Sequence, residues 1–118
     1  MKKLIVAGML LSSSLLMSAA QAEDYVIDSK GSHAFIQFKI KHLGYSWLLD
    51  RFNDFTGTFS YDEKNPSAAK IVVDIDPASV DSNHAERDKH LRGEDFLHVE
   101  KFPKAKFVST SFEEKGNG

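Results

Sequence analysis

The chain contains no cysteine, and this absence removes several kinds of chemistry at once. Without thiols there are no disulfide bonds, no thiolate metal sites and no cysteine nucleophile. A small domain without such cross-links must be held together by the packing of its core. The sequence also lacks a G-x-S-x-G nucleophile elbow and a glycine-rich phosphate loop of either common type. It therefore carries neither of these local signatures of serine hydrolysis or phosphate binding.

Excess positive charge is also lacking, because 15 Lys and Arg residues face 17 Asp and Glu residues, for a formal net charge of −2. Two of the basic residues, Lys2 and Lys3, stand at the extreme N-terminus, so the remainder is more acidic still. No run of like charge is long enough to form a tail. A mildly acidic chain is a poor candidate for binding nucleic acid or an anionic membrane surface, because phosphate groups do not attract it.

The first 22 residues follow the three-part pattern of a secretory signal peptide. A short basic start (MKK) precedes a mostly apolar run over 4–17, and Ala20-x-Ala22 supplies the small residues of a cleavage site. The run is shorter than the roughly 20 apolar residues of a spanning helix. We expect cleavage after Ala22 and a mature domain over 23–118. No cysteine follows the cleavage point, so we expect no lipoprotein anchor, and no later stretch is apolar enough to span a bilayer.

Alternation of apolar and polar residues predicts β-strands along most of the mature chain. Strands are expected over 25–27, 33–43, 53–61, 69–76 and 105–112. Segment 44–50 is too short to assign by alternation, and we expect a turn or a single helical turn there. The apolar faces are one-sided, which is typical of antiparallel meanders, sandwiches and barrels. The fold class is therefore all-β.

The sequence ends at a turn signal, the Gly- and Asn-rich cluster KGNG over 115–118. A turn leads into a partner strand, so we expect the chain to stop within a domain. Five strands cannot close a barrel of about 8 strands, the size that encloses a small ligand. Both observations favour a domain whose second half lies beyond residue 118.

Segment 83–96 changes to a helical period. Asn83 is a good N-cap residue, and Glu86 stands at the spacing of a capping box. Gly93 is expected to end the helix in a left-handed conformation. One short helix thus interrupts the strands.

Histidines and charged residues around this helix raise two chemical hypotheses. His84 and His90 are six positions apart, which is not the i, i+4 spacing of a zinc helix. An enzyme acting on a lipid phosphate or ester remains an alternative if histidines converge with Asp88 in the fold. The five histidines of the chain are His33, His42, His84, His90 and His98, and the enzyme alternative uses His33, His84, Asp88 and His90.

Arg87, His90 and Arg92 provide a second hypothesis, since arginine matches the geometry of phosphate. These three side chains are candidate contacts for an anionic head group at a pocket mouth. The other interpretation is a solvated helix with local ion pairs.

An aromatic stripe is the best functional signal among the strands. Phe38, Phe55, Phe59 and Tyr61 all fall on inward-facing positions. Such a stripe is either a packed core or the lining of a cavity for a long apolar ligand. Periodicity alone does not separate the two.

Longer motifs carry a family resemblance. They are HAFIQFKIKHLGYSWLLDRFNDFTGTFSY over 33–61, SVD over 79–81, HAERDKHLR over 84–92, DFL over 95–97 and FPKAKF over 102–107. With these motifs the chain resembles the YceI-like periplasmic proteins of the polyisoprenoid-binding family. One departure is Gly93, where similar proteins usually carry serine, and we expect only a local change there.

The resemblance implies a lipocalin-like, antiparallel up-and-down β-barrel with a helical insert, of which this chain is the first part. It also implies a periplasmic location and a lumen that holds an isoprenoid lipid, either a polyprenyl phosphate or a quinone-like molecule, without catalysis and without a cofactor or metal. The alternation gives the expected lumen residues: Ile36, Phe38, Ile40, Phe55, Phe59, Tyr61, Ile71, Val73, Ile75 and Phe107. The remaining alternative is a stress-response interaction module whose barrel is packed shut.

Overall fold

The computed structural model describes residues 22–31 and 33–116, so nearly all of the expected signal peptide over 1–22 lies outside the described residues. The described part contains strands β1 (Glu23–Val26), β2 (Ile36–His42), β3 (Ser46–Phe52), β4 (Phe55–Tyr61), β5 (Lys70–Ile75), β6 (Val80–Asp81) and β7 (Ala105–Val108), one α-helix, α1 (Ala85–Arg92), and two 3₁₀ turns, η1 (Pro66–Ala68) and η2 (Pro77–Ser79). None of its helices is long and apolar enough to cross a bilayer.

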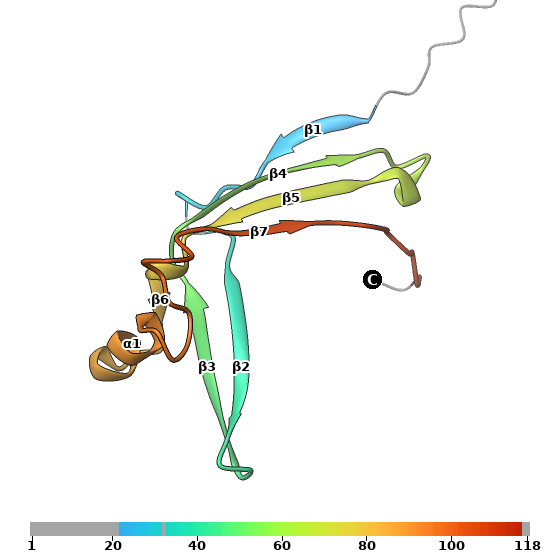
Figure 1. The fold of residues 1–118 in the computed structure, drawn as a ribbon. Coiled ribbons are helices and arrows are strands. Elements are labelled where there is room, and N and C mark those ends of the chain that lie inside the picture. Colours follow the sequence, from blue (N-terminus) through green and yellow to red (C-terminus); the bar gives the residue numbers. More distant parts are fainter. Residues whose placement is uncertain (1–21, 32, 117–118) are drawn as a thin grey trace, which may run out of the picture.

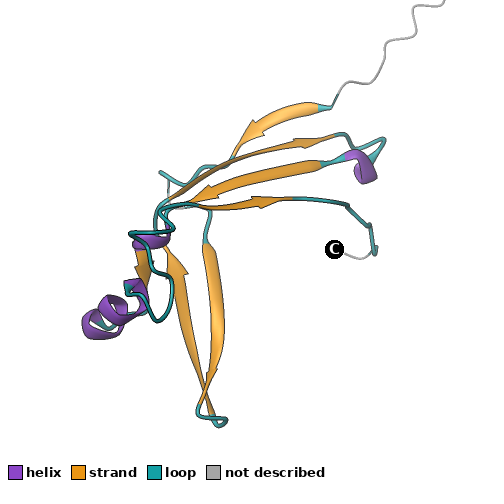
Figure 2. Cartoon of the chain, viewed as in Figure 1, coloured by secondary structure: helices purple, strands orange, loops and turns teal. Residues whose placement is uncertain are grey.

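The strands form two antiparallel sheets, a four-stranded sheet in the order β1-β4-β5-β7 and a three-stranded sheet in the order β2-β3-β6. Figure 1 shows the two sheets diverging from a shared corner, with α1 beside β6. Figure 2 shows α1 and η2 at this corner, whereas η1 lies at the far end of the four-stranded sheet. The predicted all-β class with one helical insert is confirmed, and the described strands form no closed barrel.

The corner is held by hydrogen bonds between two of the chain segments that pass from one sheet to the other, the β3–β4 and β5–β6 connections. Ser79 Oγ, in η2 between β5 and β6, accepts a bond from the Asp54 amide at 2.9 Å, and the Asn53 amide donates to the Ser79 carbonyl at 3.1 Å. The Asp76 side chain caps η2 by accepting from the Ala78 amide at 2.8 Å.

The buried apolar residues of the described part also lie at this corner. Phe55 at the start of β4 is 7% exposed and Val80 in β6 is 3% exposed, and Pro77 in η2 is buried as well. Because the corner is both hydrogen-bonded and buried, it fixes how the two sheets diverge.

The prediction of a turn over 44–50 is wrong, since β3 begins at Ser46 and pairs with β2 along its whole length. Leu43 and Gly44 both adopt positive φ, at 50° and 82°, and the Tyr45 amide donates to the His42 carbonyl at 3.2 Å. Positive φ at both central positions is the type I′ geometry that matches the twist of a hairpin. Apolar residues on both faces of β3 had hidden its alternation.

Two details of the predicted helix are also wrong. The N-cap is His84, whose Nδ1 accepts from the Arg87 amide at 3.2 Å, whereas Asn83 adopts a positive φ of 59° before the cap. Gly93 is extended, with φ −73° and ψ 175°, and is not left-handed. A Cβ at this position would lie 3.1 Å from the His90 carbonyl oxygen, so glycine suits the tight exit from α1.

Candidate functional site

The four-stranded sheet gathers seven of the expected lumen residues on one face. Directly paired residues in an antiparallel sheet share a face. The register pairs Phe59 with Tyr25 and Ile71, and it pairs Val73 with Phe107. The seven are Phe55, Phe59, Tyr61, Ile71, Val73, Ile75 and Phe107. The alternation therefore placed these side chains together correctly.

The three-stranded sheet gathers the other three. Ile36, Phe38 and Ile40 lie opposite Phe52, Asp50 and Leu48 of β3, respectively. The rings of Phe38 and Phe52 are 5.2 Å apart, so the apolar face continues across both strands of the hairpin.

The two apolar faces meet at the corner. A cleft of about 290 Å³ has Ile36 and Phe52 from the three-stranded sheet and Phe55 from the four-stranded sheet among its lining residues. Together they form a surface that runs from one sheet to the other, and we call this surface the apolar face. It consists of the ten expected lumen residues and the residues that pair with them, which are Glu23, Tyr25, Leu48, Asp50, Phe52, Gly57 and Ala105.

Much of the apolar face is uncovered by the described residues. Ile40 is 47% exposed, Tyr61 is 42% exposed and Phe107 is 53% exposed, whereas Phe55 alone among the ten is buried. Tyr25 and Phe59 stack with ring centroids 4.8 Å apart and fill only part of the surface. Such an extended apolar surface is what a long apolar ligand requires.

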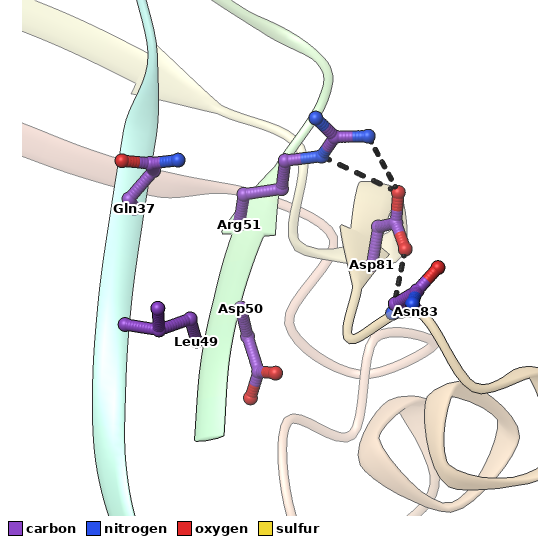
Figure 3. A pocket seen from close by; sticks show the side chains of 6 residues that line it. All are labelled: Gln37, Leu49, Asp50, Arg51, Asp81 and Asn83. Atoms are coloured by element: carbon purple, nitrogen blue, oxygen red, sulfur yellow. Dashed lines mark hydrogen bonds and ion pairs between the residues drawn. The ribbon is translucent and has the colours of Figure 1, made fainter. Parts of the chain in front are cut away.

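One polar residue on the apolar face was not anticipated. Asp50 of β3 lies opposite Phe38, is only 4% exposed, and has no hydrogen-bond partner for Oδ1 among the described residues. Figure 3 shows its carboxylate turned away from Arg51, as expected for consecutive strand residues. Because 44–50 was expected to be a turn, Asp50 was assigned to neither face of a strand. Assigning this segment to a strand would have placed the Asp50 side chain on the inner face.

The expected head-group residues lie on or at the end of α1, where two of them bind the protein's own oxygens. Arg87 donates from Nε to Ser82 Oγ at 2.8 Å and from Nη2 to the Ser82 carbonyl at 2.7 Å. Arg92 donates from Nη1 to the Val80 carbonyl at 3.4 Å, whereas His90 is exposed. Both arginines therefore tie α1 to β6 and the residue that follows it. Contact between these three side chains and a head group stays a prediction.

Asp88 completes the attachment of α1. Its Oδ1 accepts from both the amide and the hydroxyl of Ser82, at 2.8 and 2.5 Å, and Ser82 is only 3% exposed. The hydrogen bond from the Ser82 side chain is the main cause that lowers the pKa of Asp88. The charges of Arg87 and Asp88 thus converge on one buried serine.

A polar cleft of about 280 Å³ lies beside β3 and β6 (Figure 3). Arg51 Nη2 and Asp81 Oδ2 form an ion pair at 3.1 Å, and Asp81 also accepts from Asn53 Nδ2 and from the Asn83 amide. Hydrogen bonding, first from the Asn83 amide and then from Asn53 and Arg51, lowers the pKa of Asp81 to about 2. Since Arg51 is already paired, this cleft offers little attraction to an anion.

The histidines considered for catalysis are engaged in separate places. His33 Nδ1 lies 3.1 Å from Asp28 Oδ2, and His84 caps α1. The His98 ring packs edge-on to the Phe102 ring, with the ring centroids 6.0 Å apart. His42 ends β2 and His90 lies in α1. Within 22–31 and 33–116, no three His, Cys, Asp or Glu side chains are grouped so that they could hold a metal ion.

Comparison with known proteins gives a consistent result. Residues 25–118 match the family described as the YceI-like domain. A UPF0312 protein of Shewanella sp. strain ANA-3 is 60% identical, and another from Shewanella denitrificans is 59% identical, each over 118 residues. Each match covers 100% of this chain and 62% of the relative, so the chain spans less than two thirds of their length.

Two solved structures share the fold. Burkholderia cenocepacia BcnA matches with a TM-score of 0.63 and 20% identity over 70% of this chain and 51% of that one. A mutant CJ YceI protein, solved with a monobromobimane guest, matches with a TM-score of 0.57 and 32% identity over 79% of this chain and 53% of that one. These likenesses confirm the predicted lipocalin-like β architecture.

Proposed function

The chain belongs to the YceI-like family, and from this premise we propose that the protein binds and carries a long isoprenoid-type lipid without catalysis. The observation that carries the proposal is the apolar face, which runs over both sheets and remains largely exposed at Ile40, Tyr61 and Phe107. A soluble protein gains from covering such a face. A flexible apolar chain is the matching occupant.

The energetics favour reversible binding. Each methylene removed from water contributes about 0.8 kcal/mol, so a dozen contribute roughly 10 kcal/mol before costs. Ordering the chain and restricting its motion take back several kcal/mol. The remainder is enough for carriage with release, and no bond needs to be made or broken.

The head group of the cargo is part of the proposal. A polyprenyl phosphate or a quinone-like lipid would place its apolar chain on the apolar face and its head group near one end. Arg87 and Arg92 are fixed by carbonyl oxygens, so selectivity by charge alone would be modest. We propose that chain length and shape, more than the head group, select the cargo.

The proposed location is the periplasm. This rests on the three-part leader over 1–22 and on the absence of a cysteine after Ala22 that could carry a lipid anchor. A carrier there would move a water-insoluble molecule through an aqueous compartment.

Neighbouring residues of β7 provide a matched test. Phe107 lies on the apolar face and is 53% exposed, while Val108 lies on the opposite face and is 54% exposed. We would produce Phe107→Asp and Val108→Asp in the periplasm, extract each purified protein with organic solvent, and quantify isoprenoid lipid by mass spectrometry. We expect Phe107→Asp to lose at least tenfold of its lipid and Val108→Asp to keep it.

Because the two positions are equally exposed, the two variants should pay similar costs in stability, and circular dichroism would confirm that each is folded. Equal lipid content in the two folded variants would refute the assignment of the apolar face as the binding surface.

A further inference from the structure

The β2–β3 hairpin carries a second apolar surface, on the side opposite the apolar face. Leu43 is 71% exposed, Tyr45 is 79% exposed, Trp47 is 58% exposed and Leu49 is 75% exposed. The register places Trp47 opposite Lys41 and Leu49 opposite Lys39, so Trp47, Leu49 and the two lysines share the outer face of the hairpin. Leu43 and Tyr45 lie in the turn at its tip. We call the outer face and its tip the hairpin patch: Lys39, Lys41, Leu43, Tyr45, Trp47 and Leu49.

The composition of this patch is unusual for a strand face turned to water. In a half-buried antiparallel sheet the solvent side is normally polar, and apolar residues lie on the other side. Here Phe38 and Leu48 occupy the inner face, while Trp47 and Leu49 occupy the outer one. An exposed cluster of large apolar side chains on a monomer typically marks an interaction site.

Charge is segregated toward the same place. Residues 34–49 contain Lys39 and Lys41 but no Asp or Glu, although the whole chain has a net charge of −2. Lys39 Nζ lies 4.9 Å from the centre of the Trp47 ring, which places the cation over an aromatic face. The acidity of the whole chain therefore does not describe the hairpin.

We propose that the hairpin patch docks on a lipid bilayer surface. Trp and Tyr favour the boundary between head groups and acyl chains, because their rings are apolar with one polar edge. Lysines lay their methylene stems along apolar surface and keep the ammonium among anionic head groups. Leu43 at the tip is free to enter the acyl boundary, since the tip extends away from α1 and the four-stranded sheet (Figure 1).

A lipid surface fits this patch better than a protein partner does. Protein interfaces are enriched in aromatic residues and depleted in lysine at their core, whereas Lys39 and Lys41 here alternate with the apolar residues. Aromatic rings favour the interface of a bilayer, and lysines are attracted to its anionic head groups, so the two residue types together suit a lipid surface. The inner face of the same hairpin carries Phe38 and Ile40, so docking would bring the apolar face close to the source of lipid. The proposal itself stands on the outer face and does not require the proposed cargo.

Trp47 is the only tryptophan of the chain, so its fluorescence reports on the patch directly. The probe is the wild-type protein mixed with vesicles of phosphatidylethanolamine and phosphatidylglycerol, with and without brominated acyl chains. We expect a blue shift of the Trp47 emission, quenching by the brominated chains, and cosedimentation that weakens as salt is added. An unchanged spectrum and no cosedimentation at low salt would overturn the proposal.

Two variants separate the contributions. Lys39→Glu with Lys41→Glu should weaken vesicle binding by more than tenfold, since each lysine near an anionic surface contributes about fivefold. The double variant with Leu43→Ser and Tyr45→Ser should also weaken vesicle binding at least tenfold, and its remaining binding should show the same dependence on salt as that of the wild type. Val26→Ser is the control, because Val26 is 80% exposed but lies in β1 of the other sheet. Equal losses in the control would contradict a site at the hairpin.

Self-association is the competing outcome, and light scattering distinguishes it. A dimer that Leu43→Ser with Tyr45→Ser dissociates, without vesicle binding by the wild type, would overturn the docking proposal. The lipid extracted from each variant is measured in parallel. A hairpin variant that keeps its lipid but no longer binds vesicles would support docking independently of carriage. A variant that loses its lipid but still binds vesicles would count against carriage and not against docking.

Discussion

Replacing Asp50 with valine should raise the free energy of unfolding. Asp50 is 4% exposed, lies opposite Phe38 on the apolar face, and leaves Oδ1 without a partner in the described part of the chain. A buried polar group without a hydrogen bond costs about 1–3 kcal/mol. Valine removes that cost and also favours the extended backbone of β3. We expect a gain of about 1–3 kcal/mol in the ligand-free protein.

The assay is equilibrium unfolding in urea followed by circular dichroism, with thermal unfolding as a check. For a domain of this size each kcal/mol corresponds to a shift of roughly 4–8 °C in Tm. The control is Asp74→Val in β5, where the carboxylate is exposed and pairs with Lys106 at 3.5 Å. An exposed pair contributes at most about 1 kcal/mol, so this variant should be nearly neutral.

The opposite sign would refute the reasoning. If Asp50→Val lost more than about 1 kcal/mol while Asp74→Val stayed neutral, the Asp50 carboxylate would have a stabilising partner beyond the described residues. Asp50→Asn refines the result, because it removes the charge and keeps the shape. We expect it to give a smaller gain than valine, since an amide also needs hydrogen bonds.

The remaining predictions concern pH, packing and the corner. The pKa of Asp81 is lowered from 3.8 to about 2, so its stabilising contribution is complete above the ordinary value and disappears as the pH falls through about 2. Asp81→Asn should therefore reduce the change in the free energy of unfolding between these two pH values, measured by denaturation at a series of acidic pH values. An unchanged pH dependence would contradict the hydrogen-bond network. Gly57→Ala should destabilise by about 1–3 kcal/mol in urea unfolding, because a Cβ would lie 2.6 Å from Ile27 Cδ1 and 2.9 Å from the Val72 carbonyl oxygen; a neutral result would show that β4 and β5 can separate locally. Phe55→Ala should cost about 3–5 kcal/mol, since this ring is 7% exposed at the corner, and a loss below 1 kcal/mol would show that the corner is not the core.

The sequence was most informative where one face of a strand is apolar and the other polar. In β4 and β5, Phe59 and Ile71 are followed and preceded by the polar pair Ser60 and Lys70, and the period of two assigned the facing of these strands correctly. The same rule failed for β3, because Trp47 and Leu49 are apolar on the outer face. Alternation was therefore lost where the hairpin patch begins.

The corner between the sheets had no local signal. It depends on hydrogen bonds from Asn53 and Asp54 to Ser79, about 25 residues along the chain. Contacts between residues so far apart in the sequence are outside what propensity and spacing describe. The helix cap was missed for a local reason, because Asp81 accepts from the Asn83 amide two residues later and His84 caps α1 instead.

The candidate site was predicted in part for the same reason. Facing along a strand is a local property, so the shared facing of the ten expected residues was found, whereas Leu48, Asp50 and Phe52 of β3 were missed. Whether that face is covered is a tertiary property, and the sequence left open whether Phe38 and Phe59 belong to a packed core or a lined surface. The roles of Arg87 and Arg92 in fixing α1 likewise depend on where Ser82 and Val80 come to lie.

The most direct test of lipid carriage is native mass spectrometry of the full-length protein purified from the cells that produce it. The spectrum would be recorded before and after extraction with organic solvent, and the extract would be identified by its fragment masses. The proposed function predicts one bound species per protein with the regular mass increments of an isoprenoid chain. A protein that is folded, free of lipid, and unable to take up an added isoprenoid would contradict it.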